Sequence, residues 1–550
     1  MVRLDGFWLS PVETPLGPAQ SETLVTGSGF CLEIRQTNGW LRGCIRRPSA
    51  DKIALVSFWF LRSIHLIPVH FILGVIFLLG VALVSVAGAE AGQPNVLIIV
   101  ADDLGFADVG FNGGKVIATP NLDRLAATGV NLTDFRACPM CSPTRAGLMT
   151  GRWPARFGLM RAVVPPWSRY GLPASENTLP ELLGAAGYGE RVIMGKWHLG
   201  HGQREFLPLA HGFTRFYGHY NGAISYGTHE RDGEVDWHEN DRTVRETGYS
   251  TDLIGNAAAR FVREAAAGQP WLLYVPFNAP HAPYEAKEED LQKYPLLTGD
   301  RRTYAAMVDS MDQAIGRILA AVEARADAAN TWVLFFSDNG GILNVGSSNG
   351  PYRGAKLTVY EGGTRVCAAM RWPAGGVSGG KRFDQRIGYI DVLPTVLAAA
   401  GASAAKDVDG INFLPALRSG TPLPERPWFT YMHQSADAHA SVHVGNWKLV
   451  AHGDFFPDRP ATQPALELYD LATDPAEKSD LAAQQPEIVA RLHAGLREFG
   501  TWQKSGVSAY SEGRAGFVPP KDWIVGGPPA ARGDPPAPKA GKKKKSASPN

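Results

Sequence analysis

Three short apolar runs, each followed directly by polar residues, limit most strongly what this chain can fold into. The runs are residues 95–100 (NVLIIV), 271–275 (WLLYV) and 332–336 (WVLFF). Continuous runs of this length, rich in β-branched and aromatic residues, are typical of strands buried on both faces of a parallel sheet. The polar residues that follow, among them Asp102, Asp103 and Asp338, should then lie together at the carboxyl edge of that sheet.

Amphipathic segments alternate with these runs, at residues 121–127, 179–186, 252–266 and 304–325. The alternation favours an α/β fold in which a large mixed, mostly parallel sheet is sandwiched by helices and binds ligands at its carboxyl edge. Past about residue 417 the pattern changes to short runs around turns, followed by a helix at 486–499. We therefore expect a smaller C-terminal α+β subdomain on a short antiparallel sheet.

The N-terminal part carries a signal for export or for the membrane. No Asp, Glu, Lys or Arg occurs at residues 63–89, and the apolar stretch within them ends in the small-residue sequence Ala87-Gly88-Ala89. This pattern favours a cleaved signal peptide over a retained membrane anchor. We expect an exported protein, periplasmic or extracellular, that contacts the membrane only if the segment is retained.

The expected organisation has five parts. They are an N-terminal extension at 1–62 without clear periodicity, the signal peptide or anchor at 63–89, a catalytic domain at 90–417, the C-terminal subdomain at 418–525 and a disordered basic tail at 526–550.

The charge balance excludes one class of partner. The chain has 54 Lys and Arg against 53 Asp and Glu, a net charge of +1. Nucleic-acid-binding domains carry a basic excess, so we expect no nucleic acid partner.

Cysteine usage argues against a disulfide scaffold. Removal of the signal leaves Cys138, Cys141 and Cys367, an odd number, and an unpaired cysteine in an exported protein calls for a chemical reason. Cys138 and Cys367 either form a disulfide or remain separate thiols.

The segment CPMCSPTRAGLMTGR is the most informative of the chain. Ser142 as N-cap and Pro143 at the next position predict a short helix with Cys141 at its positive end. Backbone N–H groups and the helix dipole favour an anionic sulfate or phosphate there. Arg145 lies one turn into the helix and Arg152 follows on the same face, so both guanidiniums are expected to orient an oxyanion or a nucleophile.

Four residues that follow the expected strands offer only oxygen ligands to a metal: Asp102, Asp103, Asp338 and Asn339. Oxygen ligation favours Ca²⁺ or Mg²⁺ over zinc. The spacing His198-x-x-His201 suggests zinc, but no third ligand of suitable spacing follows, and zinc is not predicted.

Cys141-Ser142-Pro143-Thr144-Arg145, followed by LMTGR, resembles the signature of type I sulfatases, the formylglycine-dependent branch of the alkaline phosphatase superfamily. Other segments resemble the same family in the same order. They are NVLIIVADD at 95–103, GKWH at 195–198, NAPH at 278–281, SDNG at 337–340, Lys356 and ELYDL at 467–471. The resemblance covers nearly all of the chain's body and implies the fold of that superfamily.

The resemblance implies that a formylglycine-generating maturation enzyme oxidises Cys141 to formylglycine. One hydroxyl of the hydrated aldehyde then attacks sulfur, and the other drives collapse to the aldehyde with release of sulfate. It also implies one Ca²⁺, with Mg²⁺ less favoured, bound by Asp102, Asp103, Asp338, Asn339 and the hydrate of residue 141.

The remaining cationic groups fit the charge that develops during sulfuryl transfer. By resemblance, Arg145 and Lys196 hold the hydrate and His198 contacts its hydroxyl. His281 and Lys356 contact the sulfate and protonate or stabilise the leaving oxygen.

We therefore expect an exported sulfatase that hydrolyses a sulfate monoester of a carbohydrate or an aryl alcohol. Two alternatives stay open: a phosphonate monoester or phosphodiester hydrolase with the same nucleophile, and a non-catalytic binding protein if Cys141 is never oxidised. Loops around 160–175, 201–250 and 342–355 are expected to set the substrate. Aromatic residues near the mouth are candidates to stack on a sugar or aryl ring: Trp197, Tyr217, Tyr220, Tyr226 and Tyr284.

Overall fold

The computed structural model describes residues 92–434, 438–453, 464–508, 510 and 515–526, together with the backbone of five strands within the first 46 residues. The chain divides into two compact units, Met1–Glu90 and Ala91–Asn550, and each is described by itself. The expected signal peptide or anchor at 63–89 and the tail beyond residue 526 lie outside the described residues. Among the described residues, no helix is long and apolar enough to cross a membrane.

The first unit contains a five-stranded sheet in the order β2-β1-β3-β4-β5. The strands are β1 (Arg3–Leu4), β2 (Phe7–Trp8), β3 (Ser21–Thr26), β4 (Gly29–Gln36) and β5 (Gly39–Arg46). The sequence prediction found no periodicity here and missed this sheet. The signal is the alternation of Phe30, Leu32 and Ile34, which covers a single strand and is therefore weak.

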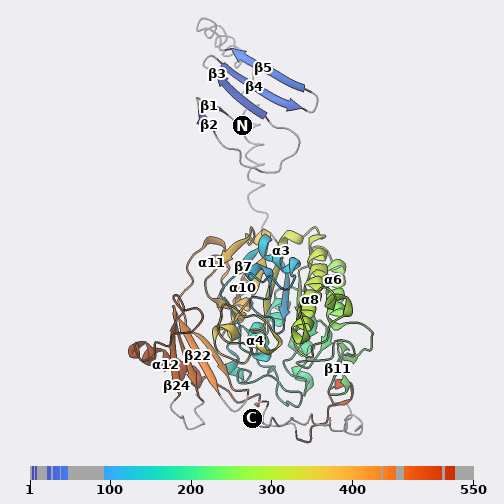
Figure 1. The fold of residues 1–550 in the computed structure, drawn as a ribbon. Coiled ribbons are helices and arrows are strands. Elements are labelled where there is room, and N and C mark those ends of the chain that lie inside the picture. The colour runs from blue at the N-terminus through green and yellow to red at the C-terminus, as the bar shows by residue number, and fades with distance from the viewer. Residues whose placement is uncertain are drawn as a thin grey trace, which may run out of the picture. The chain divides into compact units, whose positions relative to one another are not determined.

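A ten-stranded mixed sheet forms the centre of the second unit (Figure 1). Its strands are β6 (Asn95–Ala101), β7 (Val130–Leu132), β9 (Glu190–Lys196), β10 (Arg215–His219), β13 (His238–Glu239), β14 (Arg242–Thr243), β15 (Trp271–Pro276), β16 (Thr331–Ser337), β18 (Ala368–Arg371) and β19 (Lys381–Phe383). The order is β14-β13-β10-β9-β15-β6-β16-β18-β7-β19. The neighbours β10, β9, β15, β6 and β16 run parallel, and β13 and β18 are antiparallel to them at the two sides.

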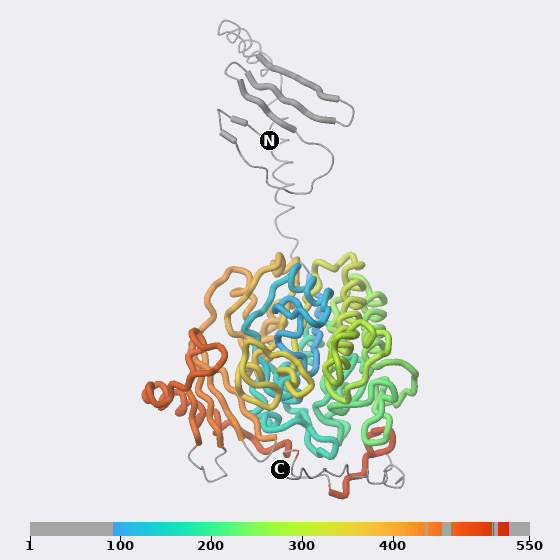
Figure 2. Tube along the Cα trace, viewed as in Figure 1, coloured from blue at the N-terminus to red at the C-terminus, as the bar shows by residue number. Residues whose placement is uncertain are grey.

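Alternating side chains of the central strands fill two separate cores. Val96 and Ile98 of β6 lie in one core and Leu97 and Ile99 in the other, as the pleat of a strand requires. The core of Leu97 is completed by α3 (Pro120–Thr128), α6 (Ser250–Glu264) and α8 (Gly299–Glu323). The core of Val96 is completed by α4 (Cys141–Thr150), α5 (Leu179–Ala185), α10 (Val392–Ala399) and α11 (Leu414–Ser419). Figure 2 shows α6 and α8 side by side as yellow-green tubes.

These layers confirm the expected α/β fold, and the predicted helices and strands lie within a few residues of their observed bounds. Strand β9 escaped prediction because its apolar run, Val192 to Met194, lies between Arg191 and Gly195 and is only half as long as that of β6. The other short elements are β8 (Phe135–Arg136), β11 (Glu230–Arg231), β12 (Glu234–Val235), β17 (Arg365–Val366), β20 (Ile387–Gly388), α7 (Glu288–Leu291) and α9 (Glu361–Thr364).

The C-terminal part contains a four-stranded antiparallel sheet, as expected. Its strands are β21 (Trp428–Met432), β22 (His439–Val444), β23 (Trp447–His452) and β24 (Ala465–Asp470), in that order, and α12 (Pro486–Thr501) follows. Leu492, Leu496 and Phe499, spaced by one helical turn, bury one face of α12 in the core of this sheet. The domain boundaries expected from the sequence stay a prediction.

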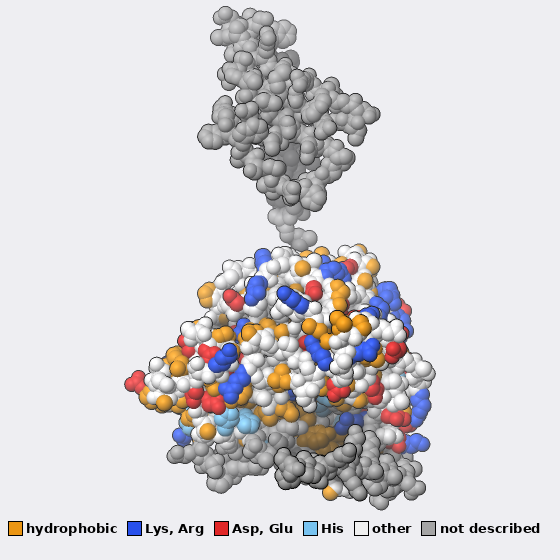
Figure 3. All heavy atoms as spheres, in the orientation of Figure 1, with side chains coloured by type: hydrophobic (Ala, Val, Ile, Leu, Met, Phe, Trp, Pro, Cys, Tyr) orange, Lys and Arg blue, Asp and Glu red, His pale blue; other side chains and the backbone are white. Residues whose placement is uncertain are grey.

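The surface matches the near-neutral charge of the chain. On the face drawn in Figure 3, Lys and Arg side chains are interspersed with Asp and Glu side chains.

Candidate active site

Four neighbouring parallel strands end side by side at the candidate site. The order β9-β15-β6-β16 places Lys196, the last residue of β9, beside Asp102 after β6 and Asp338 after β16. His281 lies in the loop that follows β15. Because parallel strands end at one edge of a sheet, residues distant in sequence meet there.

Helix α4 brings the cysteine to the same edge. Cys141 is the first residue of the helix and Met140 is its N-cap, so the prediction of Ser142 as N-cap was wrong. The Ser142 hydroxyl instead donates to the carbonyl oxygen of His198 at 2.9 Å and accepts from the N–H of Val164 at 3.0 Å. Cys141 still lies at the positive end of the helix.

The expectation for the second arginine of the motif was also wrong. Helix α4 ends at Thr150, so Arg152 lies beyond it. Its Nη1 is 2.7 Å from a carboxylate oxygen of Glu176, and this ion pair occupies the guanidinium.

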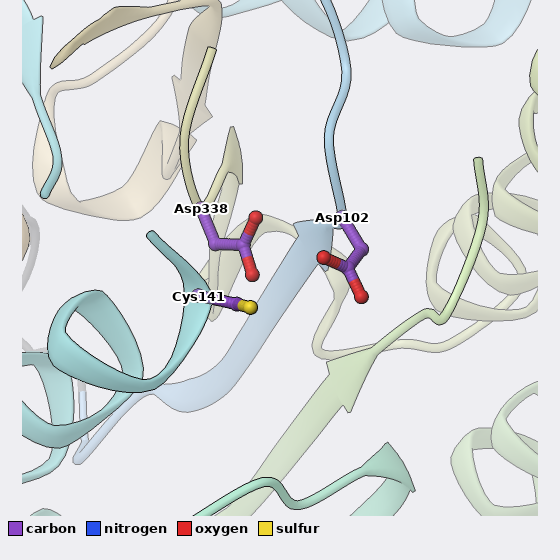
Figure 4. A group of neighbouring side chains, drawn as sticks. All are labelled: Asp102, Cys141 and Asp338. Atoms are coloured by element: carbon purple, nitrogen blue, oxygen red, sulfur yellow. The ribbon is translucent and has the colours of Figure 1, made fainter. Parts of the chain in front are cut away.

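Cys141, Asp102 and Asp338 converge on one point (Figure 4). One ligand atom from each lies within 4.8 Å of the others, and all three residues are buried. Arg145 donates to Asp338 Oδ2 through Nε at 2.9 Å and Nη2 at 2.7 Å, while Lys196 forms an ion pair with Asp102. The buried carboxylates are thus held by cations, without which their charges would be strongly destabilising.

Two oxygen atoms at this point have no hydrogen-bond partner among the described residues: Asp102 Oδ1 and Asn339 Oδ1. A buried oxygen without a donor costs free energy, so each needs an explanation. A hard divalent cation satisfies both atoms, because carboxylate and amide oxygens are its preferred ligands. The residues therefore fit a divalent metal, which Asp102, Asp338 and Asn339 would help to hold.

Asp103, another of the predicted metal-binding residues, also contacts the remaining cationic groups. Its Oδ1 accepts from Asn339 Nδ2 at 2.7 Å and lies 2.7 Å from Lys356 Nζ. His281 Nε2 is 3.7 Å from its Oδ2. The backbone of Asp103 is left-handed, with φ at 68°, a conformation that aspartate tolerates better than most residues.

The surrounding charges separate the pKa values of the two facing carboxylates. Burial by itself would raise the pKa of Asp102, but Lys196, His281 and Arg145 lower it below its ordinary value. Burial, followed by the charge of Asp102, raises the pKa of Asp338. A bound cation would favour the ionised form of both.

The two site histidines have defined tautomers. His198 Nε2 lies 3.0 Å from the carbonyl oxygen of Val164 and therefore carries the proton, while its Nδ1 has no partner among the described residues. His281 Nδ1 donates to the carbonyl oxygen of Ala282 at 2.6 Å. Burial lowers the pKa of both rings, with Lys196 adding to the effect at His198.

Two glycines permit the close packing around these groups. A Cβ at Gly195, where φ is 133°, would lie 2.0 Å from the carbonyl oxygen of Pro276. A Cβ at Gly222 would lie 2.4 Å from the ring of His198. Side chains at either position would push the strand or the ring out of place.

A pocket of about 250 Å³ leads to these groups. Its lining consists of Cys141, Val163, Val164, Pro166, His198, Gly222, Ala223, Arg231, His281, Lys356, Leu357, Gln434 and Tyr510. The expected substrate loops 160–175 and 201–250 both contribute to it. The loop 342–355 contributes no lining residue, because the chain enters the pocket only at Lys356 and Leu357.

Comparison with known proteins identifies the family. Residues 94–402 match the family model described as Sulfatase, and residues 354–501 match the model described as N-sulphoglucosamine sulphohydrolase, C-terminal. Human N-acetylgalactosamine-6-sulfatase is 34% identical over 463 residues, which cover 75% of this chain and 86% of the human protein. This chain belongs to the sulfatase family. It is a type I sulfatase of the alkaline phosphatase superfamily, and therefore a sulfuric ester hydrolase.

Other sulfatases agree with this assignment. Mouse arylsulfatase J is 29% identical over 482 residues, covering 79% of this chain and 78% of the mouse protein. The crystal structure of Ps i-CgsB has a TM-score of 0.70 and 32% sequence identity, with 76% of this chain and 96% of that chain covered.

The family motif ELYDL holds the loop that carries Lys356 in this sulfatase. Arg353 Nη1 donates to Tyr469 Oη at 2.8 Å and to the carbonyl oxygen of Glu477 at 3.0 Å. On the other side of Lys356, the N–H of Glu361 donates to Glu477 Oε2 at 2.7 Å. Strand β24 and the segment that follows it thus hold both ends of the loop.

The aromatic residues expected at the mouth are not in the lining of the pocket. Trp197, Tyr220 and Tyr226 are buried in the protein core, and Tyr226 Oη donates to the backbone of Asn278 and His281. Tyr217 and Tyr284 are partly buried, and neither lines the pocket. The sequence reasoning missed Arg231, Gln434 and Tyr510, for which no motif or strand end gave a signal. The histidines left unassigned by the sequence were His201, His211, His219, His433, His439 and His443, and none of them lines the pocket.

All three cysteines of the second unit are free thiols, so Cys138 and Cys367 do not pair. Cys138 Sγ lies 3.2 Å from Tyr389 Oη, and burial raises the pKa of its thiol to about 12. Cys367 is buried in the core on the face of the sheet that α8 covers. Neither residue has the cationic surroundings of Cys141.

Proposed function

We propose that this sulfatase is exported and hydrolyses a sulfate monoester of a carbohydrate, with formylglycine at position 141 and one Ca²⁺. The observation that carries the proposal is the convergence of Asp102 and Asp338 on Cys141, which lines a pocket. A carbohydrate substrate is supported by similarity to human N-acetylgalactosamine-6-sulfatase and to Ps i-CgsB, which was also crystallised with k-i-k-neocarrahexaose. Aryl sulfates remain a second substrate class.

Two groups would supply chemistry that the twenty amino acids lack. Formylglycine, once hydrated, offers a hydroxyl as nucleophile and a second hydroxyl that permits release of sulfate. Ca²⁺, held by Asp102, Asp103, Asp338 and Asn339, would stabilise negative charge on the sulfate oxygens.

The residues around position 141 orient the nucleophile. Arg145 and Lys196 are charged and fixed by Asp338 and Asp102, so they hold a polar group at position 141 in one orientation. The free Nδ1 of His198 accepts a proton from that group, because burial keeps the ring neutral at neutral pH.

Lys356 and His281 act on the leaving oxygen. Asp103 raises the pKa of Lys356, so its ammonium remains charged in the pocket despite its burial. An ammonium there stabilises the alkoxide that forms when the S–O bond breaks. His281 lies beside it, with Nε2 directed toward Asp103.

The test is peptide mass spectrometry across residue 141 after coexpression with a formylglycine-generating enzyme, the expected maturation partner. Conversion of Cys141, with Cys138 unchanged, and sulfate release from sulfated glycans are expected. The Cys141→Ala variant should be inactive, and Cys138→Ala is the matched control that retains activity. A fully active chain whose Cys141 is still a thiol would contradict the proposal.

The remaining alternative is a phosphonate monoester or phosphodiester hydrolase. Rates on matched sulfate, phosphonate and phosphodiester esters of 4-nitrophenol distinguish the two, and a higher kcat/KM on a phosphorus ester would favour the alternative.

Export is tested separately by N-terminal sequencing of protein recovered outside the cytoplasm, where a chain beginning at Glu90 is expected.

A further inference from the structure

Arg231 is a charged residue of the pocket lining that the proposed reaction does not use. Apart from Tyr510, the other charged or titratable lining residues are Cys141, His198, His281 and Lys356, all assigned to the proposed reaction. The rest of the lining is apolar, glycine or neutral polar. A guanidinium in such a wall must therefore have another role.

Arg231 makes one side-chain hydrogen bond and one long ion pair among the described residues. Its Nη2 donates to Tyr510 Oη at 3.2 Å, and its Nε forms an ion pair with Asp232 Oδ2 at 3.8 Å. The Nε atom is buried and makes no hydrogen bond within the described part of the chain. A guanidinium has five N–H donors, so an anion at this position would gain several charge-assisted hydrogen bonds.

The backbone around Arg231 is fixed, which makes the site preorganised. Arg231 ends strand β11, and its carbonyl oxygen accepts from Trp523 Nε1 at 3.0 Å. The N–H of Asp522 donates to Glu234 Oε2 at 2.8 Å on the other strand of the same hairpin. The C-terminal segment therefore supports the hairpin from outside, and little entropy is lost when a ligand binds.

The pocket is small enough for one sugar to contact both Cys141 and Arg231, which line it. At about 250 Å³ the pocket is smaller than typical drug-sized sites, and it suits a single sugar unit. A sugar whose sulfate ester lies at Cys141 then presents another substituent, or its glycosidic neighbour, to Arg231. Tyr510, whose hydroxyl accepts from Arg231, has its own proton available for the same group.

We propose that Arg231 and Tyr510 form a binding site for a second anionic group of the substrate, a carboxylate or a second sulfate. The proposal rests on the proposed function and narrows its substrate to carbohydrates that carry at least two anionic groups. A planar guanidinium suits both anions because it pairs with two oxygens at once.

The test compares Arg231→Gln with the natural chain on matched substrates. These are a monosulfated monosaccharide, the same sugar linked to a uronate, the same disaccharide with its carboxylate reduced, and a disulfated disaccharide. The natural chain should prefer the dianionic substrates, and Arg231→Gln should reduce that preference in kcat/KM about 10–100-fold, mainly through KM. Arg231→Lys should keep part of it, and Tyr510→Phe should have a smaller effect.

Arg215→Gln is the matched control, because this arginine pairs with exposed Glu190 outside the pocket. It should leave the preference unchanged. Equal losses on all four substrates in Arg231→Gln, or no preference in the natural chain, would overturn the proposal. Preference for the uronate or for the second sulfate tells which anion the site takes.

A binding experiment tests the anion site separately from the proposed hydrolysis. In the Cys141→Ala chain, calorimetry measures binding of the same four sugars without turnover. A loss of affinity for dianionic sugars in the Arg231→Gln, Cys141→Ala double variant supports the anion site even if no sulfate ester is hydrolysed. Equal affinities in the two chains would overturn it.

Discussion

The floor and the rim of the pocket are built in different ways. The floor, defined here as the lining residues Cys141 and Lys356 with the buried Asp102, Lys196 and Asp338 behind them, is held by the ends of parallel strands, one helix terminus and buried ion pairs. The rim, defined as Val163, Pro166, Arg231, Gln434 and Tyr510, comes from loops, a hairpin and the C-terminal segments. Residues that carry out the reaction of a family typically lie on a rigid part of the fold, here the edge of a sheet. Residues that select the substrate typically lie on the surrounding loops.

The largest expected effect concerns the floor. Asp338→Asn removes a charged ligand and the partner of Arg145, and activity on every sulfate ester should fall by about 10³-fold. Ca²⁺ at 100 times its Kd should stabilise the natural chain by about 2.7 kcal/mol, and this gain should disappear in the variant. Thermal unfolding with and without Ca²⁺ measures it.

The matched control for this experiment is Asp409→Asn, which breaks a carboxylate–guanidinium pair with Arg156 outside the pocket. It should lower the melting temperature equally at all Ca²⁺ concentrations. A Ca²⁺ dependence that survives in Asp338→Asn would mean that the metal binds elsewhere.

Lys356→Ala tests whether the ammonium group of Lys356 stabilises the leaving oxygen. Loss of the ammonium should lower kcat/KM about 10²–10³-fold on sugar sulfates, whose alkoxide needs stabilisation. It should have a much smaller effect on 4-nitrophenyl sulfate, whose phenolate leaves readily. The exposed Lys504→Ala is the control. Equal losses on both esters would remove Lys356 from leaving-group stabilisation.

Tyr469→Phe tests how far the C-terminal sheet supports the floor. The variant loses the acceptor for Arg353, and the resulting displacement of the Lys356 loop should lower kcat/KM on sugar sulfates about tenfold. As in Lys356→Ala, kcat/KM should fall more on sugar sulfates, which have a poor leaving group, than on 4-nitrophenyl sulfate. Tyr170→Phe, which loses a hydrogen bond to the carbonyl oxygen of Phe157, is the control and should show no such selectivity.

The last prediction concerns stability rather than catalysis. Burial lowers the pKa of His219, at the end of β10, to about 3. Because the unfolded chain binds this proton more readily, stability is complete above about pH 6.5 and falls as the pH decreases toward the folded value. His219→Asn should reduce the slope of unfolding free energy against pH by up to about 1.4 kcal/mol per unit. Denaturant titrations between about pH 7 and 4 measure the slope, and an unchanged slope would contradict the expectation.

Local patterns predicted that Asp102 and Asp338 of the floor meet, whereas Lys196 and Lys356 were named only from the family resemblance. The strands before Asp102 and Asp338 are apolar runs with a distinct length, and the position of a parallel strand end follows from the fold. The rim was poorly predicted for the opposite reason. Arg231 lies on a two-residue strand, and Tyr510 reaches the pocket only through tertiary packing. Trp197 and Tyr226, two of the candidates to stack on a substrate ring, are instead buried in the core.

The contact between Trp523 and the hairpin gives the pocket an order of assembly. A ribosome supplies every floor residue long before Trp523 emerges, so a chain interrupted late in synthesis carries the complete catalytic edge without support for the wall opposite. Trimming by proteases at this terminus would have the same result. The hairpin that carries Arg231 therefore gains this support only when one of the last described segments of the chain has been made.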